Sequence, residues 1–355
     1  MKTTLSLGDK ILTLPAFFPD ATRGFLRSAA PADALVAGVQ GMEMSTWHLI
    51  ASPGASLIKA AGGLHAFTGW QGPILTDSGG FQAWSLVAKD PSKGRIDRGG
   101  ITYRDERRGK KVELTPTRCI AAQLDMGSDI VLCLDCCTDP MAPRAEQEKA
   151  VELTIRWAKE CREEFDRRTE KWERKPLLFA VIQGGNELDL RRQCADALIP
   201  MGFAGYGYGG WPLDREGNLL YDLMAATADL MPDNTVKYAM GLGRPEEIVK
   251  LNQAGYQLFD CVIPTREARH AKLYAMNGKP LSADGFYDAV YINKESMARD
   301  FRPVEPGCPC AACQGHSRAF LHHLFACEDP LGLRLATVHN LSFFARLMAR
   351  IADEA

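Results

Sequence analysis

The stretch Ile130-Val131-Leu132-Cys133-Leu134-Asp135 is a short apolar run that ends in a carboxylate. Similar runs recur along the chain, and most end in a polar residue or a glycine before a stretch with helical periodicity. These other runs are residues 38–45, 74–77, 177–183, 203–209, 236–241 and 257–264, with a weaker one at 272–275. The clearest helix between them is expected at residues 145–168, where apolar side chains share one face. Strands and helices that alternate in this way predict an α/β fold, a (β/α)8 barrel.

The predicted strands end in residues that can carry chemistry. A barrel of this kind has its active site at the C-terminal ends of its strands. The residues that fall there are Asp77, Asp135, Gln183, Gly209, Met240 and Asp260. Any one aspartate alone is explained by capping the following helix. Three at one face suggest paired acid/base and nucleophilic roles, because one carboxylate can attack a sugar carbon while another transfers a proton.

A glycine pair follows the first of these aspartates. Gly79-Gly80 gives a turn flexible enough to bring Phe81 near a planar ligand. The alternative is that Phe81 packs in the core.

A cysteine-rich segment near the C-terminus predicts a metal site. Cys308, Cys310, Cys313 and His339 have the residue types and close thiolate spacing that a tetrahedral Zn²⁺ needs. The prolines and glycine around the cysteines favour a knuckle-like turn over three unrelated core cysteines. Three thiolates and an imidazole leave no open coordination position, so the zinc is expected to be structural.

The order of these segments predicts the domain organisation. The cysteine-rich segment follows the last predicted strand and precedes an amphipathic helix at residues 341–352. We therefore expect the barrel at residues 1–280, an inserted zinc-binding subdomain at 281–340 and a final barrel helix at 341–355.

Composition narrows the class of protein. With 355 residues, 46% hydrophobic and 24% charged, the chain is typical of a globular protein with one large or two smaller α/β domains. The 11 cysteines and the lack of a basic and apolar leader favour a reducing cytoplasm. No apolar run is long enough to span a bilayer.

The net charge gives little information about binding partners. A net charge of −2 argues against a protein that coats nucleic acid, although it allows a local basic patch. The basic run at residues 104–111 is more typical of a solvated hairpin than of an RNA clamp.

Four longer motifs resemble the tRNA-guanine transglycosylase (queuine tRNA-ribosyltransferase) family. They are Leu75-Thr76-Asp77-Ser78-Gly79-Gly80-Phe81-Gln82, Val181-Ile182-Gln183-Gly184-Gly185, Tyr238-Ala239-Met240-Gly241 and Phe259-Asp260-Cys261-Val262-Ile263-Pro264-Thr265-Arg266. The zinc residues and Asn340 agree with the family as well, and the resemblance extends from about Leu14 to the last helix. It implies an irregular (β/α)8 TIM barrel with an inserted zinc subdomain. It also implies exchange of guanine in tRNA, at the wobble position of the anticodon, for a 7-deazaguanine base.

The resemblance assigns a role to each matching residue. Asp260 would be the nucleophile on ribose C1′, giving a covalent intermediate, and Asp77 the general acid/base. The base would be bound by Phe81, Asp135, Gln183, Gly210 and Met240. Arg266 and Arg269 would lie near the RNA backbone.

The chain departs from the family pattern around the base pocket. Trp211-Pro212-Leu213 stands where bacterial members have small, flexible residues, so the accepted base is expected to differ. Ser45 replaces an amide near Asp77, and Ala271 replaces a glycine.

The sequence is compatible with two other functions. The chain could be a non-catalytic RNA-binding partner subunit, although the presence of all three aspartates argues against it. It could also act on DNA or on another substrate. The archaeal type is not expected, because no RNA-binding domain follows Ala355. A homodimer is compatible with the sequence.

Overall fold

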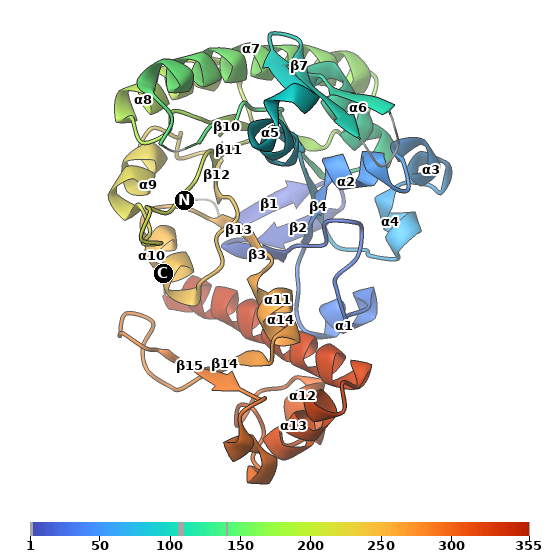
Figure 1. Ribbon diagram of the computed structural model, residues 1–355, viewed down its shortest axis with the longest axis vertical. Coiled ribbons are helices and arrows are strands. Elements are labelled where there is room, and N and C mark those ends of the chain that lie inside the picture. The colour runs from blue at the N-terminus through green and yellow to red at the C-terminus, as the bar shows by residue number, and fades with distance from the viewer. Residues whose placement is uncertain (1–2, 106–109, 140, 355) are drawn as a thin grey trace.

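The computed structural model describes residues 3–105, 110–139 and 141–354. Its centre is a sheet of eight parallel strands, with the order β3-β13-β12-β11-β10-β9-β5-β4 (Figure 1). The strands are β3 (Ala16–Pro19), β4 (Met42–Ser45), β5 (Ile74–Asp77), β9 (Ile130–Leu132), β10 (Leu177–Ile182), β11 (Gly205–Tyr208), β12 (Val236–Ala239) and β13 (Leu258–Cys261). A parallel bridge between Asp20 and Glu43, just beyond β3 and on β4, closes the sheet into a barrel. The predicted (β/α)8 barrel is therefore confirmed.

One of the predicted strands forms, but not in the barrel. The run at residues 272–275 forms β14 (Lys272–Met276), which pairs antiparallel with β15 (Tyr287–Tyr291) outside the barrel. The eighth barrel strand is β3, which the sequence analysis did not identify. A short apolar run between two prolines is a weak strand signal, and apolar periodicity does not tell a barrel strand from a hairpin strand.

Helices cover the outside of the barrel (Figure 1). The predicted helix at 145–168 is α7 (Arg144–Thr169), which packs on α6 and α8. The other helices that follow barrel strands are α2 (Thr46–Ala51), α5 (Gly80–Lys89), α8 (Leu188–Leu198), α9 (Tyr221–Ala228), α10 (Pro245–Gln253) and α11 (Ile263–Arg269), whereas α6 (Pro116–Met126) precedes β9. Shorter helices are α1 (Pro31–Val36), α3 (Ala55–Ala60) and α4 (Leu64–Thr68).

Two small antiparallel sheets extend the barrel. The hairpin β1 (Thr4–Leu7) and β2 (Lys10–Thr13) buries its leucines against the residues that fill the barrel. The other sheet contains β6 (Gly94–Asp97), β7 (Gly100–Asp105) and β8 (Lys110–Leu114). β7 and β8 pair as a hairpin at the basic run 104–111, of which residues 106–109 lie outside the described part of the chain.

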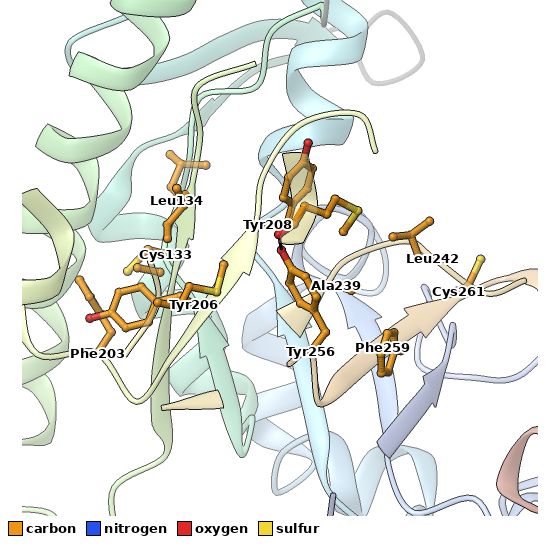
Figure 2. Packing of buried hydrophobic residues seen from close by; sticks show 14 of the residues in the cluster. Cys133, Leu134, Phe203, Tyr206, Tyr208, Ala239, Leu242, Tyr256, Phe259 and Cys261 are labelled. Carbon is orange, nitrogen blue, oxygen red and sulfur yellow. Dashed lines mark hydrogen bonds between the residues drawn. The ribbon is translucent and has the colours of Figure 1, made fainter. Parts of the chain in front are cut away.

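The side chains of the barrel strands alternate between the interior of the barrel and its outer face. On β13, Leu258 belongs to the cluster that fills the barrel, whereas Phe259 belongs to the cluster beneath the helices. On β11, Tyr206 and Tyr208 point to the outer cluster (Figure 2). Because side chains in a strand alternate, Asp260 must point into the barrel. The same alternation decides which residues at the other strand ends face the cavity.

The C-terminal segment forms a second lobe (Figure 1). It contains β14, β15, α12 (Ala311–Gly315) and α13 (Arg318–Ala326), with their own buried cluster. The last helix, α14 (Pro330–Glu354), is longer than the predicted 341–352 and packs on both this lobe and β3. Among the described residues, no helix is both long and apolar enough to cross a membrane.

Candidate active site and metal centre

A cavity of about 290 Å³ opens at the C-terminal ends of the barrel strands. Nearly all of the residues predicted for catalysis or base binding line it: Asp77, Phe81, Asp135, Gly210, Met240 and Asp260. Gln183 lies directly behind Asp135 and donates a hydrogen bond to it over 2.7 Å. Residues that are far apart in the sequence therefore meet around one cavity.

Asp260 is held by two donors. The Tyr238 hydroxyl and the Gly241 amide both donate to its Oδ1, over 2.6 and 2.8 Å. Burial raises the pKa of Asp260 to about 6, and the two hydrogen bonds act in the opposite direction. The carboxyl group is thus ionised near neutral pH, and its Oδ2 accepts no hydrogen bond within the described residues.

Asp77 lies at the end of β5 in a different environment. The Thr46 amide donates to Oδ1 over 2.8 Å and the Gln82 amide to Oδ2 over 2.9 Å. Burial raises the pKa of Asp77 to about 7, against these bonds and one from Ser45. The Ser45 side chain thus lies close enough to Asp77 to lower its pKa. A carboxyl group with such a pKa can hold or release a proton at neutral pH.

A polar network surrounds Asp135. Its Oδ1 accepts from the Ser78 hydroxyl over 3.2 Å, and its Oδ2 accepts from Gln183 and, more weakly, from the Cys137 thiol. Burial raises the pKa of Asp135. A carboxyl group and an amide fixed side by side can bind the donor and acceptor edge of a nucleobase.

Glycines on β11 and directly after it make room for this network. A Cβ on Gly209 would lie 2.7 Å from the Gln183 amide, and one on Gly207 would lie 2.8 Å from Met240 Sδ. The buried Arg191 donates to the carbonyls of residues 182, 185 and 209, which fixes the turn that leads to Gly210. The glycines thus leave the space that the side chains of Gln183 and Met240 occupy.

Aromatic rings cover the mouth of the cavity. Phe81 and Trp211 are 46% and 48% exposed, and their ring centroids are 6.3 Å apart at an angle of 25°. Phe81 is therefore not a core residue. The substituted loop is part of the cavity wall, because Trp211, Pro212 and Leu213 all line it.

Three polar residues of the cavity were missed in the sequence analysis. They are Asp20, Glu43 and Tyr238. Asp20 follows an apolar run in the same way as Asp77 does, and this signal could have identified it. Glu43 lies inside an apolar run, where only the period-two pattern of β4 marks it as facing inward.

The two predicted RNA-binding arginines lie on α11, which follows β13. Arg266 is exposed and Arg269 is partly buried. Arg269 donates to the Thr265 carbonyl over 2.8 Å. Burial lowers the pKa of Arg269, and the nearby Arg27 adds to this effect. The structure thus places a small basic group at the end of the barrel that carries Asp260.

The four predicted metal ligands form a compact cluster in the C-terminal lobe. The ligand atoms of Cys308, Cys310, Cys313 and His339 all lie within 4.8 Å of one another. His339 Nδ1 is 3.8, 3.4 and 3.3 Å from the three sulfur atoms. A tetrahedral zinc site requires about 3.6 Å between nitrogen and sulfur ligands.

The second ring nitrogen of His339 supports the same conclusion. Nε2 lies 2.7 Å from the Tyr274 carbonyl. A carbonyl oxygen only accepts, so Nε2 carries the proton and the lone pair of Nδ1 faces the sulfurs, as in zinc sites. The cluster can hold a metal ion, and its donors fit Zn²⁺.

Comparisons with known proteins agree with this geometry. The profile of the family described as Queuine tRNA-ribosyltransferase matches residues 2–354. The chain is similar to proteins named Queuine tRNA-ribosyltransferase from several bacteria. The relative from Solidesulfovibrio magneticus is 39% identical over 336 residues, which cover 95% of this chain and 85% of the relative. Those from Actinobacillus pleuropneumoniae and Thermoanaerobacter pseudethanolicus are 36% and 37% identical, over 97% of this chain and 85% and 86% of the relatives. The chain therefore belongs to the queuine tRNA-ribosyltransferase family, a family of pentosyltransferase enzymes.

Proposed function

We propose that this protein exchanges guanine at the wobble position of tRNA for a 7-deazaguanine, through a covalent aspartyl-glycosyl intermediate. One observation carries the proposal: Asp260 and Asp77 face the same cavity, and their carboxyl oxygens have different hydrogen-bond partners. A nucleophile needs an oxygen that is free to attack, and Oδ2 of Asp260 accepts no hydrogen bond within the described residues, whereas each oxygen of Asp77 accepts one.

The first displacement removes guanine. Asp260 Oδ2 attacks C1′ of the nucleotide, a bond forms between that oxygen and C1′, and the bond from C1′ to N9 breaks. The electron pair leaves with guanine, and Asp77 gives its proton to the departing base. Tyr238 and Gly241 keep Oδ1 occupied, which orients the other oxygen toward the sugar.

The second displacement reverses these steps with another base. Asp77, now ionised, accepts the N9 proton of the 7-deazaguanine, and N9 attacks C1′. The ester bond breaks, and its electron pair returns to Asp260. Two inversions at C1′ retain the configuration of the sugar.

The remaining residues supply binding. Asp135, Gln183 and the Gly210 amide hydrogen-bond the edge of the base, and Phe81 and Met240 contact its two faces. Arg266 and Arg269 bind phosphates, for which a guanidinium group is well suited. Zn²⁺ on Cys308, Cys310, Cys313 and His339 would stabilise the C-terminal lobe and take no part in the reaction.

We also retain the cytoplasm as the compartment, and the division into barrel, zinc subdomain and final helix. Helix α14 begins at Pro330, so it crosses the proposed boundary between the zinc subdomain and the final helix. The alternatives are a transglycosylase that acts on DNA and a non-catalytic subunit, and the altered Trp211 loop keeps the choice of base open.

An exchange assay tests the proposal. Labelled guanine is offered with tRNA and with duplex DNA in parallel, to the wild type and to Asp260→Asn. We expect label to enter tRNA with the wild type alone. Label in DNA alone would favour the first alternative, and label in neither polymer would favour the second.

A further inference from the structure

The strands that close the barrel carry two carboxyl groups that the exchange chemistry does not use. Asp20 and Glu43 form the closing bridge, and both line the cavity with Asp77 and Asp260. The four residues come from consecutive strands in the barrel order β13, β3, β4 and β5. The two unused groups therefore lie between the proposed nucleophile and the proposed acid.

The side chain of Glu43 is buried, but its carboxyl group has no bonding partner among the described residues. The residue is 7% exposed, and its carboxyl group makes no hydrogen bond or ion pair within the described part of the chain. Burial, and then the charges of Asp77, Asp20 and Asp260, raise the pKa of Glu43 well above its usual range. A buried carboxyl group without a donor destabilises the fold. Such a group is accounted for if a ligand brings the missing hydrogen bonds.

One oxygen of the Asp20 carboxylate accepts hydrogen bonds, and the other accepts none within the described residues. Its Oδ1 accepts from the Thr22 amide over 2.6 Å and from the Thr22 hydroxyl. Within the described residues its Oδ2 accepts no hydrogen bond, so each of the two residues has acceptor capacity to spare at the same wall of the cavity.

A metal ion is not the ligand that fits. Metal binding requires several ligand atoms that converge on one point. Among the described residues, the ligand atoms of the cysteine and histidine cluster converge in this way, and those of the cavity carboxylates do not. Neutral donors that are spread along the wall, such as hydroxyl groups, suit these carboxyl groups better.

The barrel order indicates which part of the substrate meets this wall. The proposed base-binding residues Asp135, Gln183, Gly210 and Met240 follow β9, β10, β11 and β12, on the other side of the cavity. C1′ must lie at Asp260, so the sugar occupies the wall formed by β13, β3 and β4. We propose that Glu43 and Asp20 bind hydroxyl groups of the pentose, above all the 2′-hydroxyl beside C1′, and thereby select ribose over deoxyribose. This inference rests on the proposed function and deepens it.

The experiment compares two oligonucleotides that differ by one oxygen atom. One is an anticodon stem-loop of RNA, and the other has 2′-deoxyguanosine at the exchanged position. Each is tested with the wild type, Glu43→Gln and Glu43→Leu, and kcat/KM is measured for guanine exchange. Gln keeps an oxygen acceptor, whereas Leu has a similar size and none. Glu247→Gln is the matched control, because Glu247 is also buried but lies on α10 outside the cavity.

The expected result is a change in the ratio of the two kcat/KM values. We expect the wild type and the control to prefer ribose by about 10- to 100-fold, the scale of leaving one buried polar group without its hydrogen bond. Glu43→Leu should lose most of this preference by slowing the ribose substrate, and Glu43→Gln should keep most of it. The intrinsic reactivities of the two sugars cancel because every variant is tested on the same pair. Thermal melting of both variants checks that they are folded.

Three results would overturn the inference. They are a wild type with no preference for ribose, a Glu43→Leu variant that is equally slow on both oligonucleotides, and a Glu43→Gln variant that loses the preference as fully as Leu does. The second would indicate a general effect on Asp77 and Asp260, and the third would indicate that the preference depends on the charge of Glu43 and not on a hydrogen bond that it accepts. A wild type that exchanges guanine equally into both oligonucleotides leaves the proposed function intact, whereas one that exchanges it into neither refutes the proposed function, and the inference falls with it.

Discussion

The hydroxyl group of Tyr238 lies 2.6 Å from Oδ1 of Asp260 and donates a hydrogen bond to it. Tyr238 lies on the inner face of β12, two residues before the cavity residue Met240, so this strand and the residue that follows it position both the carboxylate and part of the cavity wall. Burial raises the pKa of Tyr238 well above its usual range, and the charge of Asp260 adds to this effect. The hydroxyl therefore remains a donor throughout the working pH range.

Removing this donor should change the pH dependence of the reaction. In Tyr238→Phe the ionised form of Asp260 loses a hydrogen bond, so the pKa of Asp260 should rise above about 6. The nucleophile must be ionised, and the acid limb of the kcat/KM profile should move to higher pH by about one unit, the scale of one such bond. Activity should fall more at pH 6 than at pH 8. Tyr206→Phe, on the outer face of β11, should leave the profile unchanged; an unshifted limb in Tyr238→Phe would exclude the assigned role.

Asp77→Asn should stabilise the fold and abolish guanine exchange. The pKa of Asp77 is about 7 in the fold against 3.8 ordinarily, so the folded protein prefers the protonated form. The carboxyl group therefore costs stability as the pH rises above about 4, and the cost is complete above about 7. An amide does not titrate, so the variant should melt at a higher temperature than the wild type at pH 8, with a smaller difference at pH 5. The scale is at most about 1.4 kcal/mol per pH unit. Guanine exchange should be lost.

Asp129→Asn is the matched control, because this substitution should lower the stability of the fold and not raise it. Burial tends to raise the pKa of Asp129, but hydrogen bonds from His65 and the Ile74 amide outweigh it, and the pKa is lowered. Its ionised form thus stabilises the fold above the ordinary pKa, and this stability is lost in acid. The variant should be destabilised at neutral pH. Equal effects of the two substitutions would show that local packing, and not ionisation, controls the melting temperature.

Metal removal should act on stability first. Chelation, or Cys310→Ala, should unfold the C-terminal lobe, with a loss of several kcal/mol, because the four ligands bury together around the metal. Loss of exchange should follow unfolding. Cys327→Ala removes an exposed thiol and should change neither property. A metal-free protein that keeps its melting temperature but loses activity would argue for a catalytic metal.

The sequence was sufficient for the parts of the site that belong to local motifs. Asp77, Asp135 and Asp260 could be placed at strand ends because a carboxylate after an apolar run is visible in the sequence. The four zinc ligands could be placed by their spacing. The hydrogen bond from Tyr238 to Asp260 depends on how β12 and β13 pair, and no local pattern encodes that register. The closing bridge between Asp20 and Glu43 was missed for the same reason, together with the weak signal of β3.

Gly209 should be intolerant of any side chain. A Cβ at this position would lie 2.7 Å from both Cδ and Nε2 of Gln183, so Gly209→Ala should displace the amide that binds Asp135. The base edge would then lose part of its recognition, and KM for guanine should rise by about 10- to 100-fold, as for a loss of about 1–3 kcal/mol. Gly315→Ala, which adds a methyl group to open space, should be neutral. An unchanged KM would mean that Gln183 does not contact the base.

The loop over the cavity should determine which 7-deazaguanine is accepted. Trp211 stacks on Phe81 at the mouth, and Pro212 has no amide to donate, so the loop narrows the space beside the base while offering one donor fewer. Replacing Trp211-Pro212-Leu213 by Leu-Ala-Val should leave guanine exchange intact, because Asp135, Gln183 and Met240 are unchanged. Preference among the nitrile, aminomethyl and cyclopentenediol bases should shift toward the aminomethyl base by roughly 1 to 3 kcal/mol, the scale of a change in pocket shape. Competition kinetics with the three bases measures this shift, and Trp84→Leu, which alters the other ring beside Phe81, serves as the control. Identical preferences in the wild type and the loop variant would place base selection on the barrel residues instead.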